Sequence, residues 1–230
     1  STDPAITNGN SCYSLQGAIY GIYQNGNEVG RLTTKADGTT DEISLSVGNY
    51  TIKEISAPKG YALDKTSYTA TVSSNQTAVV SVKDIPTNDP IAIEIEKVDS
   101  DGQKVQGSAS LAGAEFTIKY YDGFYGKDNL PAKATKTWVV KTIERTFPDG
   151  SKHYITGISY EYKVSGDDFY FTGDNQHPAL PLGTITVEET KAPAGYKIDG
   201  AYLVANGTTE KIEGLYVAQI RQNGDLAFLE

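Results

Sequence analysis

Two short motifs occur twice in this chain, in the same order, and this internal repeat constrains the fold more than any other feature. The first motif is Leu-x-Gly-Ala-x-aromatic, and it begins at Leu15 and again at Leu111. The second, the Glu box, is Glu-x-x-Ala-Pro-x-Gly-Tyr, and it begins at Glu54 and Glu189. Motifs that recur in the same order indicate that one structural unit is duplicated. A chain of 230 residues is long enough for two ordinary domains, so the repeat predicts two tandem copies of one fold.

The boundary between the copies is expected at residues 86–90, a short proline-rich segment that is typical of a stiff linker. We therefore place domain one at residues 1–88 and domain two at residues 89–230. The two motifs start 39 residues apart in the first copy and 78 apart in the second. Domain two is thus predicted to carry an insertion of about 39 residues, at about residues 121–175.

A strand signal runs through most of both copies. Short runs alternate Val, Ile, Thr or Tyr with polar residues, as at 50–54, 68–72 and 91–95. Asp-Gly and Asn-Gly pairs between the runs are typical of hairpin turns, and no segment has a 3.6-residue apolar period over three turns. The predicted class is all-β: two tandem immunoglobulin-like β-sandwiches, the second with a β-hairpin insertion.

The predicted insertion holds Trp138 and most tyrosines of domain two. Residues 137–142 and 153–156 flank a Pro-Asp-Gly turn at 148–150, a pattern that predicts a long β-hairpin. This hairpin either extends the sheet or presents its aromatic side chains to a ligand, because exposed aromatics on insertions often bind. The sequence favours the first interpretation and leaves the second open.

Composition argues against several classes of function. A net charge of −9 repels phosphate backbones, so nucleic acid is not an expected partner. One Cys cannot form an internal disulfide, and two His offer little for a metal site or a catalytic triad. No run approaches the roughly 20 apolar residues of a membrane helix, so no membrane insertion is expected. We expect no cofactor and no enzyme activity toward an external substrate, since the sequence has no nucleophile–base pair and no phosphate loop.

Four features together resemble the CnaB, or SpaA-type, prealbumin-like domains of Gram-positive pilins and surface adhesins. They are the two repeated motifs, the opening sequence Lys97-Val98-Asp99, and a closing Val-x-Asp strand at 82–84 before Pro86. The resemblance implies a structural stalk or pilus-subunit segment of an extracellular, cell-wall-anchored protein, with other pilin or stalk domains as partners. Because no initiator Met or signal peptide is present, we expect the anchor and signal peptide to lie outside this chain.

The resemblance also implies a spontaneous isopeptide bond between a Lys on the first strand of a domain and an Asn or Asp on the last. It assigns catalysis to Glu54 and Glu189, and the cross-link positions to Lys97 and Asp84. The chemistry suits these residue types, because burial favours a neutral, nucleophilic Lys and a protonated Glu that can shuttle protons. The alternatives are an exposed Glu at a strand end, an edge-strand lysine and an aspartate that forms a turn.

Each copy departs from the family pattern at one end. Domain one has no Lys before Leu15, so its first strand is expected to be missing. Domain two has no clear closing strand, and Asn206 and Asn223 are only weak acceptor candidates. Either the domains are trimmed, or strands pair between chains, through donor-strand exchange or an intermolecular isopeptide link.

Two competing functions follow from the same features. One is a host-ligand-binding adhesin module, with the aromatic insertion of domain two against host extracellular matrix. The other is a self-associating fibre subunit that is linked between chains. Cys12 with Gln16 is similar to the Cys–Gln thioester of some Gram-positive adhesins, but Gln16 lies inside the first motif, which favours an unmodified cysteine.

Overall fold

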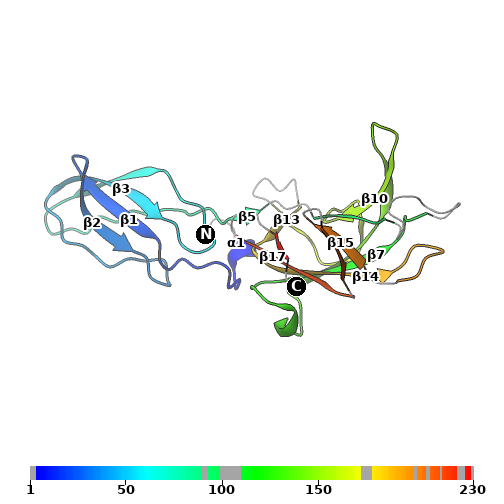
Figure 1. Ribbon diagram of the computed structural model, residues 1–230. Coiled ribbons are helices and arrows are strands. Elements are labelled where there is room, and N and C mark those ends of the chain that lie inside the picture. Colours follow the sequence, from blue (N-terminus) through cyan, green and yellow to red (C-terminus); the bar gives the residue numbers. More distant parts are fainter. Residues whose placement is uncertain are drawn as a thin grey trace. The chain divides into compact units, whose positions relative to one another are not determined.

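The computed structural model describes residues 4–89, 93–98, 110–171, 178–198, 201–205, 208–212, 214–221 and 226–228. It confirms the expected all-β class, since the described part is built from strands apart from two short helical turns. The chain divides into two compact units, Ser1–Thr87 and Asn88–Glu230, which we describe separately (Figure 1). Among the described residues, no helix is long and apolar enough to cross a membrane.

Unit 1 is built on one antiparallel sheet with strand order β2-β1-β3-β4. Its elements are the helical turn α1 (Pro4–Thr7) and the strands β1 (Ile19–Gln24), β2 (Asn27–Thr33), β3 (Gly48–Ser56) and β4 (Ser67–Val72). An Asn-Gly pair with positive φ at both positions, Asn25 and Gly26, turns β1 into β2, as a tight hairpin requires. Alternation along the strands places Tyr20, Ile22 and Tyr50 in the core.

The chain that follows β4 returns to the Glu box. The N–H of Ala62 donates to the carbonyl of Ile85 (2.9 Å), and the N–H of Thr87 donates to the carbonyl of Gly60 (2.7 Å). An isolated bridge joins Tyr61 to Pro86 between these two bonds. The end of unit 1 is therefore fixed against the box, which brings the residues just before Pro86 close to it.

Unit 2 has a six-stranded antiparallel sheet with order β11-β8-β7-β14-β17-β18. The strands are β7 (Glu115–Tyr121), β8 (Lys136–Lys141), β11 (Lys163–Gly166), β14 (Gly183–Lys191), β17 (Tyr216–Ile220) and β18 (Leu226–Phe228). Smaller sheets have the orders β6-β10-β9, β12-β13-β5 and β15-β16. Their strands are β5 (Asn88–Asp89), β6 (Glu94–Glu96), β9 (Ile143–Thr146), β10 (Lys152–Gly157), β12 (Tyr170–Phe171), β13 (Pro178–Pro181), β15 (Ala201–Ala205) and β16 (Thr208–Ile212), and η1 (Lys127–Asn129) is a 3-10 turn.

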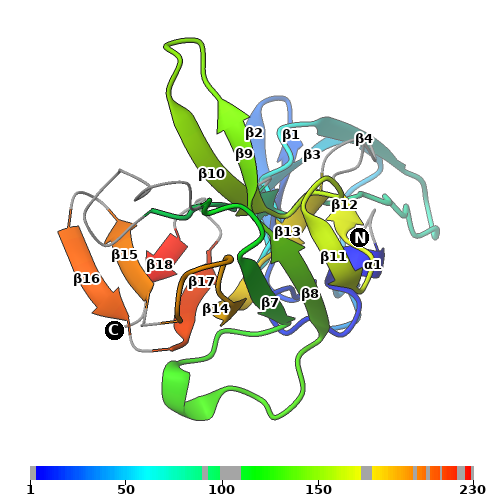
Figure 2. The ribbon, with the colours of Figure 1, turned by 90° about the vertical axis from the view of Figure 1, so that its right-hand side faces the viewer.

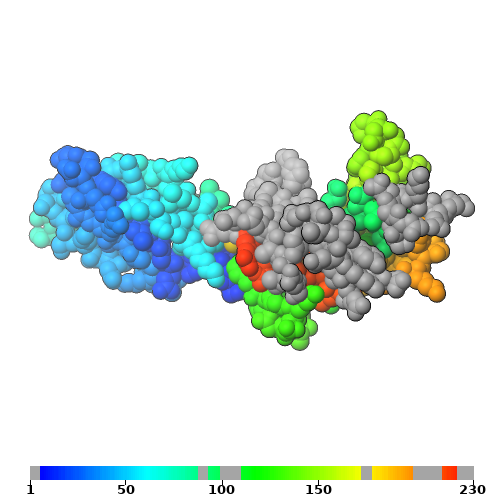
Figure 3. All heavy atoms as spheres, in the orientation of Figure 1, coloured from blue at the N-terminus to red at the C-terminus, as the bar shows by residue number. Residues whose placement is uncertain are grey.

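The predicted insertion is divided between the sheet and a hairpin. Residues 137–142, expected as one strand of the hairpin, mostly form β8, which pairs with β7 as β2 pairs with β1. The Pro-Asp-Gly turn instead joins β9 to β10, and this hairpin projects from unit 2 in two views (Figures 1 and 2). Its tip also stands out in the space-filling view (Figure 3).

Trp138 belongs to the core of unit 2. Trp138 and its same-face neighbour Val140 are both fully buried. The ring of Trp138 packs against the ring of Phe169, with 5.5 Å between the ring centroids. This burial corrects the interpretation in which Trp138 contacts a ligand, because a central strand of the sheet turns that face inward. The aromatic side chains of this region that remain exposed include Phe147 and Tyr160.

Candidate functional site

The two glutamates that begin the Glu boxes occupy equivalent places in the two units. Glu54 lies on β3 opposite Tyr20 of β1, and Glu189 lies on β14 opposite Phe116 of β7. Tyr20 and Phe116 are the aromatic residues that end the Leu-x-Gly-Ala-x-aromatic motif. In each unit, the end of the first motif and the start of the Glu box thus lie on neighbouring paired strands, and the register of the pairing is the same in both units.

The register is interrupted at the same point in both units. After the pair Tyr20–Glu54 the next pair is Ile19–Ser56, so one extra residue lies on β3. After Phe116–Glu189 the next pair is Glu115–Lys191, and β14 has the extra residue. A bulge of this kind bends the strand and re-aims its side chains. Glu54 and Glu189 are only 7% and 9% exposed, which rules out the alternative of an exposed glutamate at a strand end.

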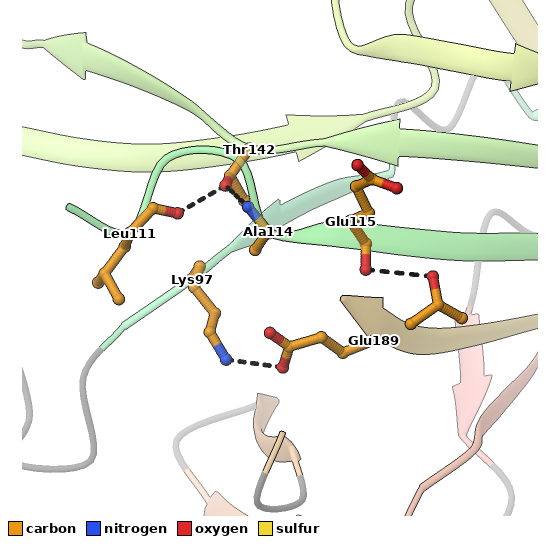
Figure 4. Close-up of polar contacts among 7 residues, drawn as sticks. Lys97, Leu111, Ala114, Glu115, Thr142 and Glu189 are labelled. Carbon is orange, nitrogen blue, oxygen red and sulfur yellow. Dashed lines mark hydrogen bonds and ion pairs between the residues drawn. The ribbon is translucent and has the colours of Figure 1, made fainter. Parts of the chain in front are cut away.

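A threonine in each unit closes the turn before the motif strand, and sequence analysis missed it. The Thr34 hydroxyl accepts from the N–H of Ala18 and donates to the carbonyl of Leu15. The Thr142 hydroxyl does the same for Ala114 (3.0 Å) and Leu111 (2.6 Å), as Figure 4 shows. Each threonine directly follows the strand that pairs with the motif strand. The number of residues between the motif and the threonine differs between the units, so the sequence does not show that the two threonines are equivalent.

In unit 2 the box glutamate, Glu189, forms an ion pair with a lysine. Nζ of Lys97 lies 2.7 Å from Oε2 of Glu189, and the side chains point toward each other (Figure 4). Lys97 directly follows β6, and its N–H donates to the carbonyl of Tyr154 on β10 (2.8 Å). The lysine side chain is 20% exposed and that of the glutamate 5%, so Lys97 is not the solvated edge lysine of the alternative interpretation.

The second carboxylate oxygen of Glu189, Oε1, is buried and has no hydrogen-bond partner among the residues that the structure describes. Asn206 and Asn223, the two acceptor candidates, lie outside the described residues. Among the groups of the predicted isopeptide reaction, unit 2 thus shows the amine of Lys97 in contact with the carboxylate of Glu189.

In unit 1 the predicted cross-link residue Asp84 and the box glutamate Glu54 are both buried, and the carboxyl group of Asp84 lies close enough to influence that of Glu54. Asp84 is 8% exposed, and Oδ1 accepts a hydrogen bond from the Tyr20 hydroxyl (3.4 Å). Oε2 of Glu54 accepts from the N–H of Asp64 (2.6 Å), whereas its buried Oε1 has no partner among the described residues. Asp84 is thus a buried carboxyl group in a segment without a turn, which does not fit the alternative of a turn former ahead of Pro86.

The electrostatics of unit 1 favour protonated groups. Burial raises the pKa of Asp84. Burial also raises the pKa of Glu54, with a smaller contribution from the carboxylates of Asp84 and Asp64. The pKa of Tyr20 is raised by burial and then by Asp84 and Glu54, so its hydroxyl stays a donor. In the described part of unit 1, no Lys or Arg forms an ion pair with either carboxyl group.

Two other sequence features show no assembled chemistry. Cys12 is buried whereas Gln16 is exposed, an arrangement that does not favour a thioester between them. Within the described ranges, no group of His, Cys, Asp and Glu side chains is arranged to hold a metal ion.

Comparison with known proteins assigns the family. The sequence profile of the SpaA prealbumin-like fold domain matches residues 7–86 and 91–214, one match in each copy of the repeat. The chain belongs to this family.

Individual relatives share shorter or more distant similarity. The chain is 41% identical over 58 residues to the trypsin-resistant surface T6 protein of Streptococcus pyogenes serotype M6, which is 25% of this chain and 11% of that protein. The Bacillus anthracis TIE protein is similar in structure, with a TM-score of 0.53 at 24% identity, over 93% of this chain and 30% of that one. A C-terminal fragment of the pilus adhesin SpaC from Lactobacillus rhamnosus GG has a TM-score of 0.42 at 17% identity, over 96% of this chain and 80% of the fragment.

Proposed function

We propose that this chain is a structural segment of a Gram-positive surface protein, a stalk or pilus subunit outside the cell, stiffened by isopeptide bonds. Family membership and the surface and pilus proteins among its relatives support the structural role. The observation that carries the chemistry is the contact between Lys97 and buried Glu189, made at the box position that recurs in unit 1 at Glu54.

The proposed reaction needs only the chain's own groups. Nζ of Lys97 passes a proton to Glu189, and the neutral amine attacks the side-chain carbonyl carbon of an Asn or Asp on the last strand. The new C–N bond forms as the bond to the leaving group breaks. The attacking nitrogen gives up its second proton and Glu189 gives back the first, so the leaving group departs with both, as ammonium from an Asn or as water from an ionised Asp. The reaction turns over once and acts on the chain itself, so the protein is not an enzyme toward other substrates.

Such a bond suits a load-bearing stalk. A covalent link between the first and last strands keeps a pulled domain from extending, without requiring an oxidant. By analogy with disulfide loop closure, a link that spans most of a domain stabilises it by about 4 kcal/mol.

Peptide mapping of the protein as displayed by its cell tests the proposal. Digestion and tandem mass spectrometry should yield a branched peptide joined through Nζ of Lys97, lighter than its two parts by one ammonia or one water. The branch should be absent from Glu189→Gln and Lys97→Arg variants, whereas Lys191→Arg, at an exposed ion pair, should keep it. A wild-type protein in which Lys97 is found only in linear peptides contradicts the proposal.

The ligand-binding alternative now rests on the projecting β9–β10 hairpin. Phe147 at its turn is exposed and stacks on His153, with ring centroids 4.2 Å apart. A host-matrix ligand at this tip predicts that Phe147→Ala reduces binding of the chain to immobilised matrix proteins while its unfolding midpoint stays unchanged. Unaltered binding in that variant rejects the alternative.

A further inference from the structure

A chain of polar contacts joins the turn of the β9–β10 hairpin to the strand that precedes Lys97. Nδ1 of His153 on β10 lies 2.6 Å from Oε1 of Glu96, the last residue of β6. Nε2 of His153 lies 2.8 Å from the hydroxyl of Ser151, and that hydroxyl lies 2.6 Å from Oδ1 of Asp149 in the turn. The contacts therefore end one residue before the lysine of the site in unit 2.

The acceptors around His153 determine how its ring is protonated. The Ser151 hydroxyl has one proton, and the carboxylate of Asp149 can only accept, so the hydroxyl donates to Asp149. The Ser151 oxygen can then only accept from His153, which requires a proton on Nε2. The carboxylate of Glu96 likewise requires a proton on Nδ1. Because both ring nitrogens donate, His153 is an imidazolium.

The surroundings of the ring favour a positive charge. The ring of Phe147 stacks on the ring of His153, with 4.2 Å between centroids, and an aromatic face attracts a cation. The pKa of Asp149 is held below its ordinary value by hydrogen bonds from Ser151 and, to a smaller extent, by His153, so Asp149 remains an acceptor. The order of contacts is the reverse of a catalytic triad, in which the serine donates its proton to the imidazole. The cluster therefore stabilises a charged ring and does not activate the serine.

The other charged groups near the ring are paired with partners of their own. Arg145 lies opposite His153 on β9, and its guanidinium forms an ion pair with Glu161. Lys152, the residue before His153, points to the other face of the hairpin and forms an ion pair with Glu144 (2.8 Å). Among the described residues, the ring thus faces two carboxylates and no unpaired cation.

The strand that carries Glu96 is joined to its sheet by a short ladder. In the described part, β6 is an end strand of the order β6-β10-β9, and three residue pairs join it to β10. The N–H of Lys97 adds one further bond to β10. Glu96 contacts His153 diagonally across the two strands, whereas Glu94 on the same face lies opposite Gly157 at the other end of β6. The contact with His153 is therefore a side-chain anchor at the end of the strand next to Lys97.

We propose that His153 is a positioning residue for Lys97, which as an imidazolium anchors β6 through Glu96 and holds the lysine strand in place. The role rests on the proposed function, since Lys97 is the amine of that reaction. Imidazole is the side chain that changes charge between pH 5 and 8. A neutral ring donates from only one nitrogen, so it cannot keep both contacts, and its attraction to Glu96 is no longer that of an ion pair. The anchor is therefore firm at acidic pH and weakens as the pH rises.

The first test observes the ring directly in the whole chain. The sequence has two histidines, so a His177→Gln variant with ¹⁵N-labelled histidine reports on His153 alone. At pH 6 we expect nuclear magnetic resonance to show both ring N–H protons, because a hydrogen bond protects each of them from exchange with water. At pH 8 at least one of the two signals should be lost. A ring that shows only one N–H proton at pH 6 overturns the proposal.

The second test measures the strand by hydrogen exchange. It uses the whole chain with Lys97→Arg, which cannot form an isopeptide bond at this position, so its outcome does not depend on the proposed function. The protection factor of the residue 97 amide should fall roughly two- to fivefold between pH 6 and 8.

Two further substitutions in that chain separate the anchor from a general pH effect. The fall in protection should vanish with Glu96→Gln and remain with Lys152→Gln, whose ion pair lies on the other face of the hairpin. The absence of any fall, or a fall that persists with Glu96→Gln, overturns the proposal. A wild-type chain with Lys97 only in linear peptides contradicts the proposed function and leaves the anchor standing.

Discussion

At Glu54 and Glu189 the same side chain occupies the same register but meets different neighbours. Glu189 contacts an ammonium group, whereas Glu54 lies near a second buried carboxyl group. A buried charge without a partner is costly, and a group in that position tends to become neutral. In unit 2 the buried glutamate is compensated by the ion pair with Lys97, whereas in unit 1 the pKa of the buried glutamate is raised.

The pair in unit 2 gives a stability prediction. Before any cross-link forms, Lys97→Met should destabilise unit 2 by about 1–3 kcal/mol, because it leaves the buried Glu189 carboxylate unpaired. The matched control is Lys191→Met, whose pair with Glu115 is largely exposed and should be worth less than about 1 kcal/mol. Urea denaturation followed by Trp138 fluorescence measures both variants, and similar losses would refute the distinction.

The carboxyl groups of unit 1 predict a pH dependence. Because burial raises the folded-state pKa of Glu54 and Asp84, the folded state holds protons that the unfolded state releases. Their contribution to stability is therefore present at low pH and is lost as pH rises from the ordinary carboxyl pKa through the raised folded value. Hydrogen-exchange protection of β1 and β3 should fall over this window, and Asp84→Asn should flatten the fall. An unchanged slope in that variant would contradict the assignment to Asp84.

At the scale of elements, the Glu box is a strand, a bulge and a glycine turn that the two units build alike. Gly60 and Gly195 both have φ near +85, at +84 and +88, in the left-handed region that side chains disfavour. Their surroundings differ, because an added Cβ at Gly60 would lie 2.7 Å from the carbonyl oxygen of Cys12, whereas an added Cβ at Gly195 would have no atom of a described residue within 4 Å.

These two glycines form a matched pair for substitution. Gly195→Ala should cost about 1–2 kcal/mol from backbone strain alone. Gly60→Ala should cost roughly 1–3 kcal/mol more, because the backbone of Cys12 must also move. Thermal unfolding of the two variants compares them, and equal shifts would show that the segment around Cys12 yields without cost.

On the scale of the whole molecule, the two units place different side chains beside equivalent box glutamates. Unit 1 has the buried carboxyl group of Asp84 near Glu54, and unit 2 has the amine of Lys97 beside Glu189. In unit 1, residues 77–84 have no backbone hydrogen bond to another described residue, so we expect this segment to be less protected than the paired strand β3.

Hydrogen exchange resolves this difference directly. Amides of residues 77–84 should exchange close to the unprotected rate, while those of β3 are protected by pairing on both sides. Protection at 77–84 that equals that of β3 would mean that the segment already has a partner.

The repeat alone predicted much of this organisation. The two motifs determined that two copies of one all-β fold follow each other, and alternation along β3 correctly placed Glu54 in line with core residues. The repeat could not reveal the role of Thr34 and Thr142. Strand pairing places each hydroxyl at its turn, and the number of residues between the threonine and the motif does not.

Trp138 shows the opposite limit. Its alternating neighbours were compatible with a projecting hairpin and with a central strand, since both have a period of two. Only the pairing of β8 with β7 decided for the core. The sequence by itself determined which residue types recur and at which motif positions. The tertiary structure decided which of them meet, because the contact of Lys97 with Glu189 and the burial of Asp84 depend on strands far apart in the chain.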